Sequence, residues 1–422
     1  MNRAQFSRAI GLGLGRAVVY ARNHDVSEFR DVILDNCLHC RAFDPQSEGT
    51  RAVYTLDLLD ALPDRPFYCG EVLKALPACG DDWDALELFH FAACLTSDGD
   101  DRAKRAMYES FKPGPRHGES IAIEFLQMDG LDGLLFAIEK ISALVAAGGV
   151  DVDLGYLISQ SFEICGERET LDALRAAGQR NPRMEAYRLA AGAERERRPA
   201  RDAERDRINA LSYEQLRREL PALKRSRLWA WGKHAGEDEL ERAAQGLIAA
   251  QDPADQMAHL LVFGLRRFPL DHRILLQLAV SEQTQVAVAA TKALSQIAHP
   301  SLRELPLGLV RNRLPGRRDA IELLGVNFEP GDHDMVLDWF EAEDDPEVLH
   351  SMGMDLEDFW ERHPDDGTVV RMLCALYEKG PCSFCREGAV RRLIQRGALS
   401  DEMREECAWD ANADIRELVA SP

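Results

Sequence analysis

Residues 27–43 read SEFRDVILDNCLHCRAF. The apolar side chains of this stretch recur at intervals of three or four residues: Phe29, Val32, Ile33, Cys37 and Cys40. That interval places them on one side of an amphipathic helix. The same pattern returns along most of the chain, for example in LDGLLFAIEKISALVAAGG at 131–149, where a glycine pair ends it. No stretch alternates as a strand does, so the sequence predicts an all-α fold.

The chain has 422 residues, more than one compact core usually holds. Its helical patterns are short and are separated by breaks that contain Asp, Pro or Gly. A short helix buries only one stripe of its surface, so such helices must pack in layers. We therefore expect an α-solenoid of degenerate helix pairs, each contacting mainly the next pair. A set of unrelated helical domains is the structural alternative.

Three segments of the later half resemble HEAT repeats: SEQTQVAVAATKALSQIAHP at 281–300, AEDDPEVLHSM at 342–352 and WDANADIRELVA at 409–420. In that family an Asp- or Asn-rich turn often precedes a helix that starts with Val or Ile. Asp345–Pro346 and Asp414–Ile415–Arg416 match this turn, in which Asp caps the helix and Pro occupies its first turn. The chain is also similar to bacterial HEAT-repeat proteins of undescribed activity. The resemblance implies a HEAT/ARM-like fold and no mechanism.

The stretch 190–220, AAGAERERRPARDAERDRINALSYEQLRREL, is highly charged and is interrupted by Pro199. We place a domain boundary here. The predicted parts are an N-terminal helical region, 1–200, with a polar cluster, and a C-terminal HEAT-like region, 201–422, with an acidic face. An exposed helix with solvated charges is favoured over a flexible linker.

The formal net charge of −21 opposes broad affinity for nucleic acid or acidic membranes. The charge is uneven: residues 180–233 hold 15 Lys and Arg against 8 Asp and Glu, whereas residues 331–366 hold one Arg against 14 Asp and Glu. No apolar run is long enough for a membrane span. Ten cysteines without an export signal predict a cytoplasmic protein with free thiols, including Cys94 as a small buried hydrophobe.

The most specific polar stretch is CRAFDPQSEGTRAVY at 40–54. Asp44, Pro45 and Glu48 fit the cap and first turn of a helix, and Arg41 fits the end of the helix before it. A structural network between helices explains such a cluster, and so does a pocket for a carboxylate or phosphate. The candidate binding residues are His39, Arg41, Asp44, Gln46, Glu48, Arg51 and Tyr54.

The stretch LKRSRLWAWGK at 223–233 interleaves cations with aromatic rings, which can contact phosphates and stack on bases. The candidate nucleic-acid contacts are Lys224, Arg225, Arg227, Trp229, Trp231 and Lys233. Some HEAT-like proteins are DNA glycosylases with a basic concave face. The resemblance to them stops at the solenoid, because no catalytic carboxylate can be matched. A tryptophan-anchored helix junction is the structural alternative.

Two CxxC pairs occur, Cys37/Cys40 inside a predicted helix and Cys382/Cys385 at a predicted helix start. A helix start favours the thiolate, and Cys407 is a third candidate metal ligand. Because structural zinc needs four ligands, packing thiols are favoured over metal. GLGLG at 11–15 lacks the preceding strand of a dinucleotide site, so Gly13 and Gly15 predict close helix packing.

The acidic block EPGDHDMVLDWFEAEDDPEV at 329–348 lacks the order of a calcium loop. It predicts a solvated face or a docking face for a basic partner. No Ser–His–Asp, Walker, HExxH or kinase motif occurs. We therefore expect a non-catalytic scaffold, without cofactor, that binds a protein or peptide. The alternatives are a nucleic-acid-binding or DNA-repair protein and a small-molecule or anion binder at the polar cluster.

Overall fold

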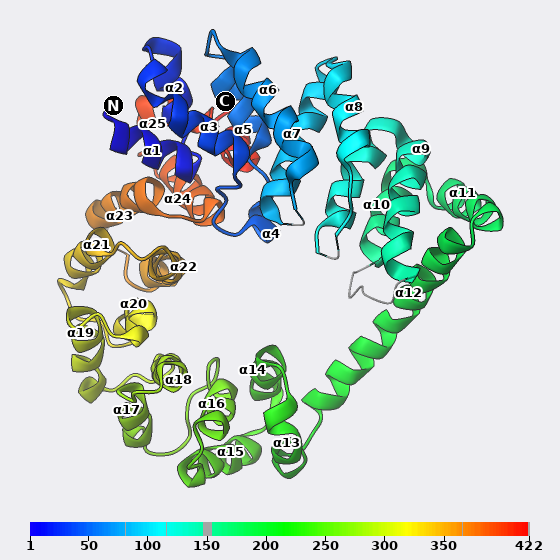
Figure 1. Ribbon diagram of the computed structural model, residues 1–422. Coiled ribbons are helices and arrows are strands. Elements are labelled where there is room, and N and C mark those ends of the chain that lie inside the picture. The colour runs from blue at the N-terminus through cyan, green and yellow to red at the C-terminus, as the bar shows by residue number, and fades with distance from the viewer. Residues whose placement is uncertain (81, 115, 147–153, 365, 421–422) are drawn as a thin grey trace. The chain divides into compact units, whose positions relative to one another are not determined.

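A computed structural model describes residues 1–80, 82–114, 116–146, 154–364 and 366–420. Every regular element in these ranges is a helix, and no strand occurs among them, as the sequence predicts (Figure 1). No helix within these ranges combines the length and apolarity needed to cross a membrane.

The described chain divides into two compact units. Unit 1 contains Met1–Arg198, Cys382–Glu387 and Leu399–Pro422, and unit 2 contains Pro199–Pro381 and Gly388–Ala398. The charged stretch at the predicted boundary is helical, because α12 spans Pro182–Asn209, and its residues 202–207 are exposed.

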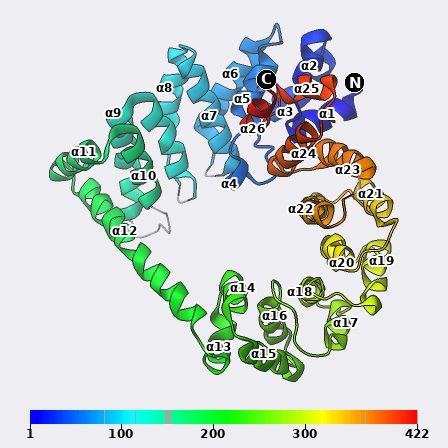
Figure 2. The same cartoon turned by 180° about the vertical axis from the view of Figure 1, so that it is seen from behind.

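Unit 1 is built from the following helices: α1 (Arg3–Leu12), α2 (Arg16–Asn23), η1 (Ser27–Phe29), α3 (Arg30–Leu38), α4 (Pro45–Glu48), α5 (Ala52–Leu59), α6 (Arg65–Ala75), η2 (Leu76–Ala78), α7 (Trp83–Ser97), α8 (Asp101–Ser110), α9 (Gly118–Ala146), α10 (Leu154–Cys165), α11 (Glu167–Arg180), α25 (Asp401–Cys407) and α26 (Ala413–Ala420). The start of α24 (Ser383–Gln395) also belongs to it. Both views of the ribbon show α25 beside α2 (Figures 1 and 2).

Unit 2 holds the remaining helices: α13 (Tyr213–Glu219), η3 (Leu220–Ala222), α14 (Arg225–His234), α15 (Glu237–Ala249), α16 (Pro253–Val262), α17 (Arg273–Ala279), α18 (Thr284–Leu294), η4 (Pro300–Leu302), α19 (Glu304–Arg311), η5 (Pro315–Asp319), α20 (Ala320–Val326), α21 (Asp332–Ala342), α22 (Pro346–Arg362) and α23 (Asp366–Lys379). The even-numbered helices from α14 to α22 contact one another in series, with η5 between α18 and α20. Helices α15, α17 and α19 pack against α16, α18 and α20, whereas α13 contacts α15 and α21 contacts α23.

Residues 27–43, whose pattern predicts an amphipathic helix, form two helices, η1 and α3, rather than one continuous helix. The predicted core side chains Phe29, Ile33 and Cys37 are buried. However, α3 ends at Leu38, so the predictions that Cys40 lies inside this helix and that Arg41 ends it were wrong.

The glycines of GLGLG permit a close approach between the first two helices and residues 406–411 of the same unit. A Cβ on Gly15 would lie 1.9 Å from the carbonyl oxygen of Glu406, and one on Gly13 would lie 2.5 Å from Cβ of Ala411. The Gly13 carbonyl also accepts a hydrogen bond from the Ala411 amide at 2.8 Å. Close packing, as predicted, is the role of these glycines.

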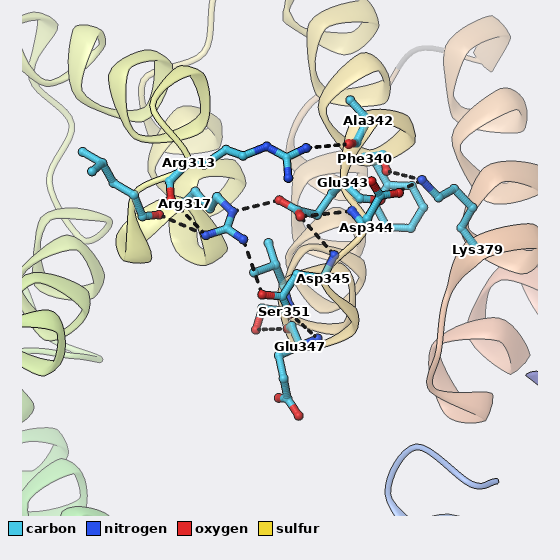
Figure 3. A network of polar contacts seen from close by, with 12 residues as sticks. Arg313, Arg317, Phe340, Ala342, Glu343, Asp344, Asp345, Glu347, Ser351 and Lys379 are labelled. Atoms are coloured by element: carbon cyan, nitrogen blue, oxygen red, sulfur yellow. Dashed lines mark hydrogen bonds and ion pairs between the residues drawn. The ribbon is translucent and has the colours of Figure 1, made fainter.

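The acidic turn before α22 is a structural junction (Figure 3). The buried Glu343 carboxylate accepts hydrogen bonds from Arg317 Nε at 2.8 Å and from the backbone of Asp344 and Asp345. Lys379 Nζ donates to backbone carbonyls at the end of α21. Asp345 caps α22, with Pro346 in the first turn and Val348 buried, which confirms the predicted capping. At the second predicted turn the cap is Asn412, and Asp414 lies inside α26.

Candidate functional site

A groove in unit 2 runs along α14, α16, α18 and η5. It consists of two overlapping cavities of about 320 Å³ and about 590 Å³. Both cavities are lined by Arg225, Met257, Leu261, Thr284 and Gln285. The smaller one continues to Trp229, Leu260, Gly264, Val288, Ala289, Lys292, Arg318 and Asp319. The larger one continues to Leu220, Leu223, Leu228, Pro253, Ala254, Ala258, Glu282, Gln283 and Val286.

Local sequence explains why the groove walls lie close together. Asp252 caps α16 by accepting hydrogen bonds from two backbone amides of its first turn, and Pro253 starts the helix. A Cβ on Gly232 would lie 2.0 Å from the Val262 carbonyl, so this glycine lets α14 and α16 touch. A Cβ on Gly264 would lie 2.9 Å from the Trp229 indole nitrogen, so the indole lies over this glycine.

Within the groove, Trp229 and Arg225 offer side chains to a ligand. Trp229 is 41% exposed although it is a large aromatic residue. The exposed Arg225 donates to the neutral Gln285 side chain at 3.1 Å and has no ion pair with a described carboxylate. The groove therefore combines an apolar floor with a cation that is free to pair with an acid.

The end of the groove at α18, η5 and α20 carries a cluster of carboxylates. Lys292 pairs with Glu322, whose second oxygen accepts from Gln296 Nε2 at 3.1 Å. Oδ2 of Asp319 and Oδ2 of Asp355 are buried and have no hydrogen-bond partner among the described residues. Burial raises the pKa of Asp319 to about 6, and burial together with Glu322 raises the pKa of Asp355 to about 8.

This carboxylate cluster was missed in the sequence. The one local signal is Lys292, a single charged residue within an otherwise apolar helical stretch, AVAATKALSQI at 287–297. Its partner Glu322 lies 30 residues later, and nothing in the local pattern links the two.

The basic stretch 223–233 does not form a continuous nucleic-acid surface. Trp231 is fully buried, and its indole nitrogen donates to the Leu211 carbonyl at 2.8 Å, so this ring cannot stack on a base. Lys224 and Lys233 are exposed but do not line the groove, and Arg227 is half-buried. Of the predicted nucleic-acid contacts, only Arg225 and Trp229 line the groove.

Part of the N-terminal polar cluster lines a separate cavity of about 390 Å³ within unit 1. Glu48 and Arg51 contribute to it, together with Ser383, Asn412 and Arg416 from distant parts of the chain. The charges around it are mostly paired. Arg386 and Asp410, both fully buried, lie 3.2 Å apart, and Arg416 Nη1 lies 2.6 Å from Asp57.

Arg51 and Tyr54 tie this network to the start of the chain. Arg51 Nη1 donates to the Gly11 carbonyl at 2.6 Å, and Nη2 lies 3.5 Å from Glu48. Burial and the neighbouring Arg386 lower the pKa of Arg51. The Tyr54 hydroxyl donates to the Leu14 carbonyl at 3.0 Å, and burial raises its pKa. Helix α5 starts at Ala52 and carries Tyr54, and Arg51 is its N-cap.

The other predicted members of the polar cluster do not line the cavity. His39 Nδ1 lies 2.7 Å from Asp84, and Arg41 pairs with Asp35. Asp44 starts α4 and accepts from the Ser47 hydroxyl at 2.7 Å, and Gln46 is exposed. Of the predicted binding residues, this cavity brings together Glu48 and Arg51 and does not include Arg41.

The predicted helix-start cysteines lack the thiolate character expected there. Cys382 and Cys407 are buried, and Cys385 is half-buried. A hydrogen bond with Cys382, together with burial, raises the pKa of Cys385, and burial raises that of Cys37.

A thiol, an imidazole and a carboxylate meet in unit 1, which the sequence did not indicate. His90 Nδ1 lies 2.9 Å from the buried Glu124 carboxylate, and Cys94 follows His90 by one helical turn. Burial alone would lower the pKa of His90, but its interactions with Cys94 and Glu124 outweigh burial and raise the pKa to about 10. Cys94 is half-buried rather than fully buried as predicted.

Comparison with known proteins finds no relative: no protein-family model matches the chain, and neither a curated protein nor a solved structure matches it. Function must therefore be argued from the chemistry of the groove.

Proposed function

We propose that the protein is a HEAT-like α-solenoid that acts as a non-catalytic scaffold and holds a segment of another protein in the unit 2 groove. The observation that carries the proposal is the pair of overlapping cavities, each lined mainly by apolar residues of α14, α16 and α18, which share Met257 and Leu261 on α16. An elongated apolar groove between helices suits a peptide that inserts several side chains.

The chemistry of the groove favours a particular partner. Met257, Leu260 and Leu261 offer apolar contact area, and the half-exposed Trp229 is of the residue type that most often dominates binding energy at interfaces. Arg225 lacks an acidic partner among the described side chains, and a carboxylate on the bound segment would supply one. The expected partner is an apolar segment with an acidic residue. The ten free thiols fit a cytoplasmic setting.

The test is selection from a library of displayed peptides on the full-length protein. Selected peptides should be rich in apolar residues with an acid, and Trp229→Ala or Arg225→Glu should each weaken their binding about tenfold, or about 1.4 kcal/mol. Leu265→Ala is the matched control, because Leu265 is 52% exposed and does not line the groove. Peptides whose binding ignores both groove substitutions would refute the proposal.

A second candidate is nucleic-acid binding, including the repair function, because Arg225 and Trp229 place a cation and an exposed ring in one cavity. The net charge of −21 and the burial of Trp231 count against it. Binding of single-stranded DNA that weakens steeply with salt and is lost in Trp229→Ala would favour this candidate over a peptide.

A further inference from the structure

The end of the groove formed by α18, η5, α20 and α22 contains more acidic than basic groups. The groups that face one another there are Lys292 on α18, Arg318 and Asp319 on η5, Glu322 on α20, and Asp355 and Asp358 on α22. Asp358 is exposed and lies 3.6 Å from Arg362, so three carboxylates, those of Asp319, Glu322 and Asp355, face the cations Lys292 and Arg318. Lys292 is already engaged by Glu322, and Arg318 donates to the Ser351 hydroxyl at 3.0 Å.

Two buried oxygens in this cluster are unsatisfied. Oδ2 of Asp319 and Oδ2 of Asp355 have no hydrogen-bond partner within the described part of the chain, although Glu322 beside them has both oxygens occupied. A buried carboxylate oxygen without a donor is costly, so natural proteins usually pair such atoms. Asp319 also lines the groove, which places its carboxylate within reach of a bound molecule.

From this arrangement we infer that the inner end of the groove binds a lysine or arginine side chain of the partner segment, with the cation donating to Asp319. The alkyl chain of that residue would lie along Leu260 and Val288, which line the same cavity. The inference rests on the proposed function for the source of the cation. Arg225 selects an acid and Asp319 selects a base within one groove, so the two would fix the direction in which the segment lies.

Binding of a cation here should depend on pH. The pKa values of Asp319 and Asp355 are raised to about 6 and about 8, so part of the cluster holds protons near neutrality. A cation favours the ionised carboxylates and must displace these protons. Its affinity therefore rises with pH until both carboxyls are ionised.

The experiment uses n-butylamine and n-butylguanidine as probes for the two side chains, with n-butanol as the uncharged control. The readout is the indole NMR signal of Trp229, identified by its loss in Trp229→Phe. We expect the cationic probes to bind at least tenfold more tightly than butanol at pH 7.5, and about tenfold more tightly at pH 7.5 than at pH 5.5. In Asp319→Asn the cationic preference should disappear while butanol still shifts the signal, which shows that the groove is intact. Asp338→Asn, an exposed acid outside the groove, should change nothing.

Equal binding of butylamine and butanol, or a cationic preference that survives Asp319→Asn, would overturn the inference. The peptide selection separates this failure from failure of the proposed function. Selected groove-binding peptides without Lys or Arg would refute the cation site and leave the scaffold proposal standing.

Discussion

Replacing a buried carboxylate of the groove cluster by its amide should stabilise the protein. The pKa of Asp355 is raised from 3.8 to about 8 because the carboxyl is buried and lies near Glu322 and Asp319. One pKa unit corresponds to about 1.36 kcal/mol, so ionisation in the folded state costs at most about 6 kcal/mol. Relaxation of the site reduces this cost of ionisation. We therefore expect Asp355→Asn to raise the free energy of unfolding by about 2 kcal/mol at pH 8.5.

The sign of the pH dependence follows from proton binding. Below pH 3.8 the carboxyl is neutral in both states and the penalty is absent. Between pH 3.8 and about 8 the unfolded chain is ionised while the folded protein keeps its proton, so stability falls as pH rises and then levels off. The advantage of Asp355→Asn should therefore grow from pH 5.5 to pH 8.5.

Urea unfolding followed by tryptophan fluorescence measures this difference at each pH. Asp338→Asn is the control, because it removes one exposed acidic charge from α21 and should behave as the wild type. A variant Asp355→Asn that is less stable than the wild type at pH 8.5, or a difference that is the same at every pH, would refute the reasoning.

Three further predictions concern unit 1. In urea melts, Gly15→Ala should lower the free energy of unfolding by about 3 kcal/mol, because its Cβ would collide with the Glu406 backbone. The control Gly11→Ala lies in open space within α1 and should raise the free energy of unfolding by about 0.5–1 kcal/mol. Glu124→Gln should lower the pKa of His90 from about 10, which an NMR titration measures. The stability from this pair is present below pH 6.5 and lost toward pH 10, so the wild type should weaken more across that range than Glu124→Gln, which keeps the Cys94 interaction. Asp410→Asn should cost about 3–5 kcal/mol of unfolding free energy, because it removes the carboxylate charge 3.2 Å from the fully buried Arg386 guanidinium; a loss below 1 kcal/mol would contradict this.

Most helices could be predicted because burial of one stripe imposes a visible period on the sequence. Their ends could not be predicted equally well. Gly49, with φ of 75°, separates α4 from α5 within the polar stretch, and α3 ends two residues before Cys40. A period shows which residues face the core, whereas a helix end depends on contacts such as that of His39 with Asp84.

The sites were harder to predict than the fold, because each is assembled across long sequence distances. Glu48 and Arg51 could be selected as polar residues next to a helix cap, but Arg416 reaches their cavity from the last described helix. The carboxylate cluster of the groove is even harder to recognise in the sequence, because Asp319 and Asp355 lie in stretches where charged residues are common. Packing of α18, η5, α20 and α22 brings them together, and no local pattern encodes that packing.

The two polar clusters differ in how their charges are compensated, and this difference separates structure from function. In unit 1 each of Arg51, Arg386 and Arg416 has a carboxylate partner, as expected for a network that joins residues 1–60 to residues 383–387 and 399–416 of the same unit. In unit 2 the carboxylates outnumber the cations. Buried oxygens without a donor in the described chain occur in both clusters, on Asp410 in unit 1 and on Asp319 and Asp355 in unit 2, so the excess of carboxylates is what distinguishes unit 2. Selection for stability alone would remove such a cost, for example through Asp355→Asn. A groove that keeps these buried carboxylates is less stable when empty, but the same carboxylates stabilise the complex when a cation binds. Sites adapted to a ligand commonly lose folding free energy in this way.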